Sequence, residues 1–169
     1  DLSDPRIRID GGRFILCEFP SLRLPPNAEW GISNLKARGW QPIVAHPERY
    51  RNLDDRFEAL EKLRKAGAFF QVNAGSLLGQ HGDIPQRAAK RLLRQGWVEY
   101  IASDYHARGE PATQRALALL HAQGGGAQAV RLSEENPKRM LDGEDPLPVT
   151  PLESQPKDVT WWQRLLKRQ

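Results

Sequence analysis

The chain has 169 residues, which is enough for one domain that buries about two-thirds of the surface exposed by its unfolded form. Hydrophobic residues make up 39% of the sequence, and its 14 Gly and 13 Pro suit a loop-rich α/β domain better than a disordered chain. Of the formal charge of +4, residues 150–169 contribute +2, from four Lys/Arg and two Asp/Glu, so the rest is nearly neutral. This balance argues against a nucleic-acid-binding protein.

A single cysteine, Cys17, excludes an intrachain disulfide and, with no signal peptide in view, favours the cytoplasm. No apolar run approaches the roughly 18 residues of a membrane-spanning helix. The sequence begins at Asp1 instead of a methionine, so we expect the amino-terminal part of the domain to be missing.

Periodicity predicts strands and helices in alternation along the chain. Residues 6–9 alternate as a strand does and end at a glycine turn, which predicts a strand beside the next one. Further strands are predicted over residues 13–17, 43–45, 68–72 and 99–103. Helices are predicted over residues 28–38, 54–66, 83–95 and 111–122, followed by two short helices over 127–132 and 134–141.

The most informative stretch is the strand over residues 43–45 together with the turn after it. The apolar run leads directly to His46 and is broken by Pro47. An α/β fold places its chemistry in this way, at the carboxyl ends of its strands. Arg49 comes three residues after the histidine, and its planar guanidinium suits a phosphate oxyanion.

The same arrangement recurs in the other strand-helix units. Polar residues follow the strands at intervals of 27 to 31 residues, close to the length of one unit. We therefore expect these residues to share one rim: Glu18, His46, Asn73, Asp104 and His106.

The donors at this rim indicate a metal site. Two carboxylates, Glu18 and Asp104, and two imidazoles, His46 and His106, suit Mn, Fe or Zn better than Ca. Asp104 and His106 are two residues apart, which allows both to face one metal. Metal ions there would bind phosphate oxygens and convert a bound water to hydroxide, while Arg49 offsets the phosphate charge.

Simpler explanations exist for individual residues. His46 alone could be a hydrogen-bonded turn residue, and Asn73 could simply hydrogen-bond the turn at Gly75. His81 and His121 are expected on the surface. Two neighbours of the central stretch, Tyr50 and Arg51, are candidates for the mouth of the site.

A second phosphatase chemistry is disfavoured. Cys17 and Arg23 have the Cys-x5-Arg spacing of cysteine-dependent phosphatases. That mechanism needs a thiolate cradled by successive backbone N–H groups, and Pro20 lacks an N–H. Next to Glu18 on a strand, Cys17 is expected to face the core.

Four runs in the sequence carry a family resemblance: Ile15-Leu16-Cys17-Glu18-Phe19-Pro20, Ile43 to Tyr50 including His-Pro-Glu-Arg-Tyr, Gln71-Val72-Asn73-Ala74-Gly75-Ser76, and Ser103-Asp104-Tyr105-His106. Together they resemble the bacterial capsular and exopolysaccharide tyrosine-protein phosphatases of the PHP (polymerase and histidinol phosphatase) superfamily. The resemblance covers residues 6–146.

The resemblance implies the carboxyl-terminal portion of a distorted TIM-like (β/α)7 barrel, with two or three metal ions, usually manganese. It implies hydrolysis of phosphotyrosine on the tail of a bacterial tyrosine kinase that controls polysaccharide export. Carried over, Glu18, His46, Asp104 and His106 would be metal ligands. Arg49 would bind phosphate, and Arg108 is the nearest counterpart of a second arginine of the family.

The family's first strand carries a His-x-His pair that has no counterpart here, so we expect this chain alone to bind metal weakly. Residues 1–146 are predicted to form the phosphatase domain, truncated at its amino end. Residues 147–169 are predicted to be a Pro- and acid-rich linker with a short basic amphipathic tail. The sequence leaves homo-oligomerisation open.

Two alternatives remain open at this stage. One is a small-molecule phosphatase resembling histidinol-phosphate phosphatase. The other is a regulatory PHP module without catalysis. A nuclease of the same superfamily is disfavoured by the near-neutral body.

Overall fold

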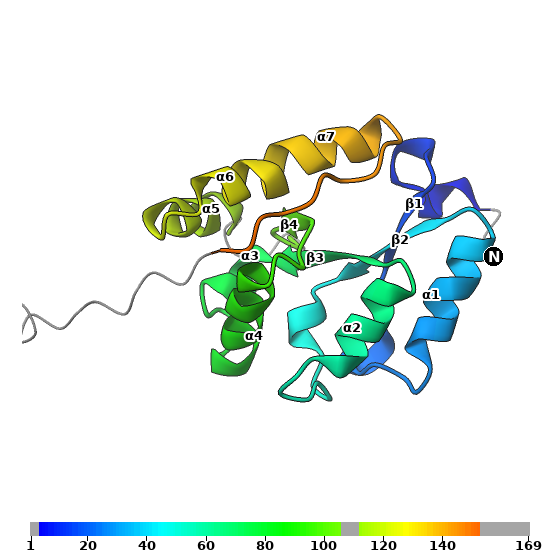
Figure 1. Cartoon of the computed structure of the whole chain (residues 1–169), viewed down its shortest axis with the longest axis horizontal. Helices are drawn as coiled ribbons and strands as arrows, with labels where there is room; N and C mark the ends of the chain where they lie inside the picture. The colour runs from blue at the N-terminus through cyan, green and yellow to red at the C-terminus, as the bar shows by residue number, and fades with distance from the viewer. Residues whose placement is uncertain (1–3, 106–111, 153–169) are drawn as a thin grey trace, which may run out of the picture.

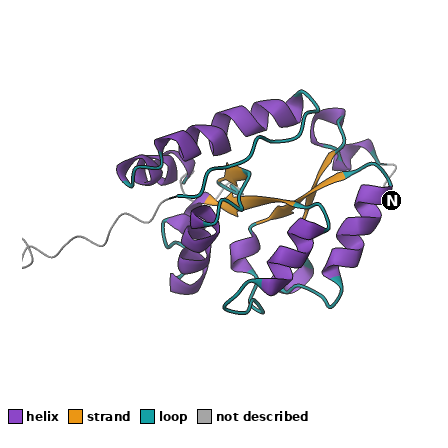
Figure 2. Ribbon diagram, in the orientation of Figure 1, coloured by secondary structure: helices purple, strands orange, loops and turns teal. Residues whose placement is uncertain are grey.

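The computed structural model of the chain describes residues 4–105 and 112–152. Its centre is a parallel sheet in which the strands lie in the order of the sequence. They are β1 (Phe14–Cys17), β2 (Gln41–Ala45), β3 (Phe69–Asn73) and β4 (Tyr100–Ala102). This confirms the α/β class (Figure 2). The four described strands form an open sheet with β1 and β4 at its edges, so the expected barrel stays a prediction.

Helices connect the parallel strands, as the alternating pattern predicts. The connections contain α1 (Ala28–Ala37), α2 (Glu58–Lys65), the short α3 (Ala74–Leu77) and α4 (Asp83–Arg94). The helix α5 (Thr113–Ala122) follows β4. In Figure 1, α1, α2 and α4 lie on one side of the sheet.

The predicted strand over residues 6–9 is wrong. The segment forms two short 3-10 turns, η1 (Pro5–Ile7) and η2 (Ile9–Gly11), and touches the sheet only through an isolated antiparallel bridge between Arg8 and Ile15. Asp10, just after this range, has a φ of 49°, a left-handed conformation that ends any extended backbone there. The alternating side chains therefore do not continue as a strand.

The two short helices predicted after residue 126 form one continuous rod, visible along the top of Figure 1. It consists of α6 (Gly126–Val130), a wide π turn η5 (Arg131–Glu135) and α7 (Asn136–Leu141). Pro137 has no N–H to donate to the preceding turn, and the wide turn lies just there. A π turn thus lets the helix continue where the sequence pattern predicts a break.

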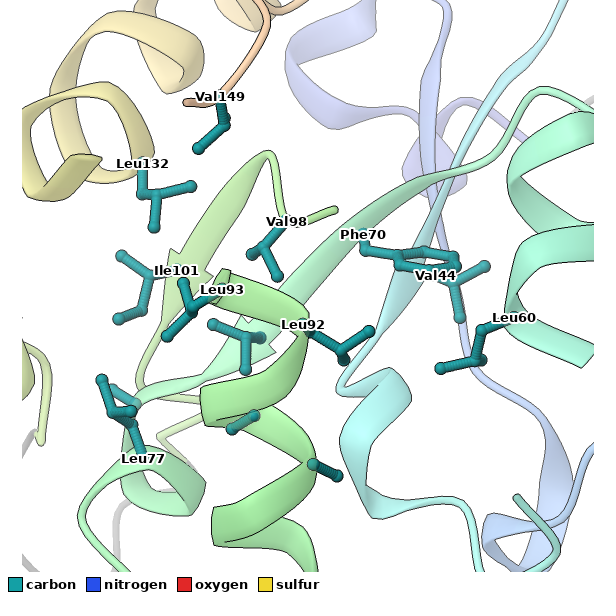
Figure 3. Close-up of a cluster of buried hydrophobic side chains, with 14 of the residues drawn as sticks. Val44, Leu60, Phe70, Leu77, Leu92, Leu93, Val98, Ile101, Leu132 and Val149 are labelled. Atoms are coloured by element: carbon teal, nitrogen blue, oxygen red, sulfur yellow. The ribbon is translucent and has the colours of Figure 1, made fainter. Parts of the chain in front are cut away.

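Both faces of the sheet are apolar, as expected for parallel strands. On one face Val44, Phe70 and Ile101 pack with Leu60 of α2 and Leu92 of α4 in a large buried cluster (Figure 3). The alternate residues face the other way and form a smaller cluster of Phe14, Ile43 and Tyr100, covered in part by Met140 of α7. The sheet is therefore held from both sides, which fixes the ends of its strands.

The segment from residue 144 to residue 152 lies along the body in an extended conformation. The buried Asn136 donates to the Leu147 oxygen (3.2 Å) and accepts from the Leu147 N–H (2.8 Å). Leu152 donates to the Leu93 oxygen (3.2 Å), and Val149 is buried in the large cluster. These contacts attach residues 147–152 to the body, and the domain boundary at residue 146 stays a prediction. Among the described helices, none combines the length and apolar character needed to cross a membrane.

Candidate active site

His46 stands directly after β2, at the start of the turn η4 (Pro47–Arg49). Its N–H donates to the Gln71 oxygen of β3 (2.7 Å), and its φ of 34° is left-handed. Asp104, after β4, has a φ of 50°. Non-glycine residues in this conformation are uncommon, and they concentrate at functional sites. Two such residues follow two strands of one sheet.

Glu18 and His46 lie side by side, as the sequence predicts. Glu18 Oε1 is 3.4 Å from His46 Nε2, with the histidine buried and the carboxylate largely exposed. Burial, followed by the charge of Arg49, lowers the pKa of His46, while Glu18 and Asp104 act in the opposite direction. The imidazole is therefore neutral near pH 7, and neutral imidazole is the form that binds metals.

Asp104 connects Arg49 with Asn73. Arg49 Nη1 and Asn73 Nδ2 each lie 3.2 Å from Asp104 Oδ2. The Oδ1 atom of Asn73 accepts from the Gly75 N–H (2.8 Å), which confirms the simpler explanation for this residue. Its second hydrogen bond, to Asp104, was not foreseen from the sequence. The Arg49 side chain is held there and remains 23% exposed.

Glu48 is a site neighbour that sequence reasoning missed. Its carboxylate is fully buried, with Oε1 accepting from the Asn73 N–H (3.1 Å) and Oε2 without a hydrogen-bond partner. Burial raises the pKa of Glu48 to about 7. In sequence, a glutamate between Pro47 and Arg49 is indistinguishable from an ordinary surface charge.

His81 is the second neighbour whose place was not foreseen. The side chain is exposed, as predicted, but its Nδ1 lies 2.8 Å from the Ser76 Oγ. Partial desolvation of the ring, followed by the charge of Arg49, lowers the pKa of His81; the charge of Asp104 acts in the opposite direction. His81 therefore belongs to the same rim. The only signal in the sequence was its position in the loop that follows Asn73 and Ser76.

The described residues fit a metal in chemistry but supply only part of a coordination shell. His46 Nδ1 is buried without a hydrogen-bond partner, and an oxygen donor lies beside the ring. Within residues 4–105 and 112–152, no three His, Cys, Asp or Glu side chains are close enough to hold one ion. Two predicted site residues, His106 and Arg108, lie outside the described part of the chain.

The remaining candidates have defined positions. Tyr50 is buried, and its hydroxyl accepts from the Phe19 N–H (3.1 Å), so it supports the strand end carrying Glu18. Arg51 is exposed. Burial raises the pKa of the Cys17 thiol to about 11. A thiol with this pKa is protonated at neutral pH, which counts against the cysteine mechanism.

Residues 3–142 match the protein family described as capsular polysaccharide synthesis, CpsB/CapC. The chain belongs to this family. It is 32% identical over 130 residues to the tyrosine-protein phosphatase YwqE of Bacillus subtilis, a match that covers 76% of this chain and 51% of YwqE. It is 25% identical over 140 residues to the tyrosine-protein phosphatase CpsB of Streptococcus pneumoniae, covering 79% of this chain and 58% of CpsB.

Solved structures agree with the CpsB/CapC assignment. A chain from the crystal structures of YwqE from Bacillus subtilis and CpsB from Streptococcus pneumoniae, described as unique metal-dependent tyrosine phosphatases, superposes with a TM-score of 0.73 at 27% identity. The superposition covers 86% of this chain and 60% of the solved chain. The present chain thus spans about half the length of the curated CpsB/CapC relatives it matches.

Proposed function

We propose that the protein to which this chain belongs is a metal-dependent phosphatase that hydrolyses phosphotyrosine on a bacterial tyrosine kinase and so regulates capsular or exopolysaccharide synthesis. The observation that carries the proposal is the meeting of Glu18 with His46, and of Arg49 with Asp104, after three strands of a CpsB/CapC fold. Relatives of this fold are tyrosine-protein phosphatases. The cytoplasmic location stays a prediction.

The proposed metal ligands are Glu18, His46, Asp104 and His106. Manganese, in two or three ions, is the proposed metal, since carboxylate and imidazole donors suit it, and iron or zinc fit the same donors. When bound, the metal supplies positive charge for the phosphate oxygens and a water of lowered pKa. Arg108 is a proposed second phosphate contact.

The chain's own residues prepare the site before substrate arrives. His46 is held neutral by burial and by Arg49, so no proton has to leave it before it acts as a ligand. Asp104 orients the Arg49 guanidinium, and Asn73 in turn orients Asp104. A preoriented guanidinium stabilises charge that develops on phosphate oxygens at little cost in reorganisation.

The test is a comparison of substrates with the full-length protein, loaded with manganese. The three substrates are a phosphotyrosyl peptide, a small aryl phosphate and histidinol phosphate. We expect kcat/KM to be highest for the peptide, lower for the aryl phosphate and lowest for histidinol phosphate. Removal of the metal with a chelator should abolish turnover, and added manganese should restore it. A higher kcat/KM for histidinol phosphate would mean that the substrate is a small molecule and not a protein. Bound metal without turnover of any of the three would favour a regulatory module.

A further inference from the structure

A groove lies next to the turn that follows His46. It runs between residues 48–57 and the exposed side of α4 and has a volume of about 640 Å³. We call it the α4 groove. It is lined by the following residues: Glu48, Tyr50, Arg51, Leu53, Asp54, Asp55, Phe57, Ile84, Arg87, Ala88, Lys90, Arg91 and Arg94.

Positive charge dominates the walls of the α4 groove. The walls present five cations and two exposed aspartates, while the third acidic residue of the lining, Glu48, is buried. Among the described residues, none forms an ion pair with the side chains of Arg51, Arg87, Lys90 or Arg94. These cations come together from a loop and a helix about 40 positions apart, so the nearly neutral charge of residues 1–149 gives no sign of them.

One cation of the groove is held in place. The Arg91 guanidinium stacks over the Phe57 ring, 4.5 Å from its centroid, and its Nη1 donates to the backbone carbonyl oxygen of Asp55. A guanidinium fixed by stacking loses less side-chain entropy when it binds a carboxylate. Arg91 thus gives the groove a preorganised site for an acidic group.

The floor of the groove is apolar. Tyr50, Phe57 and Ala88 are buried beneath it, whereas Ile84 at the start of α4 is 73% exposed. A volume of this size lies within the range of roughly 300–1,000 Å³ typical of ligand sites. An apolar floor under cationic walls fits a peptide that alternates acidic and apolar side chains better than a uniform polyanion, which Asp54 and Asp55 would repel.

The groove shares one turn with the candidate active site. Glu48 and Tyr50 line the groove, and Arg49 between them binds Asp104. In Figure 1, α4 stands beside the cyan turn that follows β2, and α4 and η4 are in contact. The α4 groove therefore borders the turn that carries Arg49.

We infer that the α4 groove binds an acidic segment of a partner polypeptide that flanks the phosphotyrosine; its link to phosphotyrosine rests on the proposed function. Carboxylates of the segment pair with Arg87, Lys90, Arg91 and Arg94, and an apolar side chain covers Ile84. The groove thereby selects phosphotyrosines in acidic surroundings, while the rim performs the hydrolysis.

Binding is tested without catalysis, on the 169-residue chain. The probe is a fluorescein-labelled octapeptide of Asp, Glu and Leu that carries no phosphate, followed by fluorescence anisotropy. It should bind about tenfold more tightly than the same peptide with Asn and Gln in place of Asp and Glu, an effect of two or three ion pairs. Added salt should reduce the difference.

Two matched charge reversals identify the surface. Arg87→Glu should weaken the acidic probe about threefold or more, whereas Arg115→Glu, at an exposed position on α5 outside the groove, should leave binding unchanged. Equal binding of the acidic and amide peptides, or equal effects of the two variants, would overturn the inference. Tighter, Arg87-dependent binding of a labelled single-stranded oligonucleotide would also overturn it and assign the groove to nucleic acid.

A kinetic comparison connects the groove to the rim. With the full-length protein, a phosphotyrosyl peptide with acidic flanks should show a lower KM than one with amide flanks. Arg87→Glu should reduce the difference between these two KM values. Equal KM values would mean that the groove does not select substrate. Absence of turnover on every phosphate ester would defeat the proposed function alone, since peptide binding is measured separately.

Discussion

At the scale of single residues, the site depends on two unusual backbone positions. His46 and Asp104 both have left-handed backbone angles, a conformation that costs about 1–2 kcal/mol for a residue with a side chain. Hydrogen bonds hold both: the His46 N–H to Gln71, and Asp104 to Arg49 and Asn73. Each strand end thereby turns its side chain toward the shared rim.

Arg49 offers the sharpest test among the residues. Arg49→Ala in the full-length protein should lower kcat/KM for phosphotyrosyl peptide by about 10²–10³, because one preoriented charge for the phosphate is lost. Arg49→Lys should be intermediate, since lysine keeps the charge without the planar fork. Steady-state kinetics and metal analysis of the same samples provide the measurement. If Arg49→Ala retains both its metal and most of its activity, the phosphate-binding role is wrong.

Cys17 tests the competing mechanism. Burial raises the pKa of its thiol to about 11, so the thiol is protonated at neutral pH. Cys17→Ser should keep kcat within about twofold of the parent protein, as expected for a residue outside the chemistry. Loss of turnover by Cys17→Ser with its metal content and circular dichroism spectrum intact would revive the cysteine mechanism.

At the scale of elements, the last described residues, 144–152, pack against the body of the domain. The extended stretch after α7 passes close to Gly96, at the turn between α4 and β4. A Cβ added at Gly96 would lie 2.5 Å from the Val149 oxygen and 3.1 Å from the Pro151 nitrogen, and Gly96 has a φ of +64°. The close approach therefore requires glycine for two reasons, space and backbone conformation.

Gly96→Ala should destabilise the chain by about 2–4 kcal/mol, the sum of left-handed strain and displacement of the packed stretch. Gly39→Ala is the matched control, because Gly39 has a φ of +84° and open space where the Cβ would be placed. The control should cost only about 1–2 kcal/mol. Urea unfolding monitored by circular dichroism measures both, and equal losses would show that residues 149–151 do not press on Gly96.

At the scale of the whole molecule, the amino ends of the strands carry stabilising contacts and the carboxyl ends carry the residues proposed for chemistry. Glu99, just before β4, is a buried carboxylate whose oxygens accept from Arg64 Nη1 (2.8 Å) and the Phe70 N–H (2.7 Å). These contacts connect α2, β3 and β4 at the amino ends of the strands. The residues proposed for chemistry follow the carboxyl ends. Stability and chemistry are thus separated along the sheet, as is usual for parallel α/β folds.

The buried position of Glu99 predicts a pH dependence of stability. Burial raises the pKa of Glu99 above its unfolded value, so the folded chain favours the protonated carboxyl. The protonated Glu99 carboxyl therefore contributes to the free energy of unfolding. This contribution is fully present below the pKa of about 4.3 that a glutamate has in the unfolded chain, and it is lost as pH rises through the pKa of Glu99 in the folded chain.

Chemical denaturation between about pH 4 and pH 8 tests this dependence. Glu99→Gln should flatten the decline in unfolding free energy, since the amide does not titrate. Glu134→Gln, at an exposed position without an ion pair to any described residue, should follow the parent curve. If the unfolding free energy of Glu99→Gln declines with pH as steeply as that of the parent, groups other than Glu99 cause the decline.

Much of the architecture could be predicted from the sequence because it depends on local patterns. Apolar runs of strand length and helical spacing between Gly and Pro define β2, β3, α1 and α4 without reference to distant residues. The predicted strand over residues 6–9 is wrong because residues 5–7 and 9–11 form 3-10 turns, which alternating side chains do not reveal. The π turn before Pro137 was not predicted because helical periodicity does not show such a widening.

The sequence by itself determined the alternation of strands and helices, the family, and the residues that follow each strand. Only the tertiary structure decided which of these residues touch: Glu18 with His46, and Asp104 with both Arg49 and Asn73. It also decided that Glu48 is buried and that cations from residues 51 and 87–94 line one groove. The physical reason is that backbone preferences act between near neighbours in the chain, whereas burial and charge depend on segments that meet only after the helices pack on the sheet.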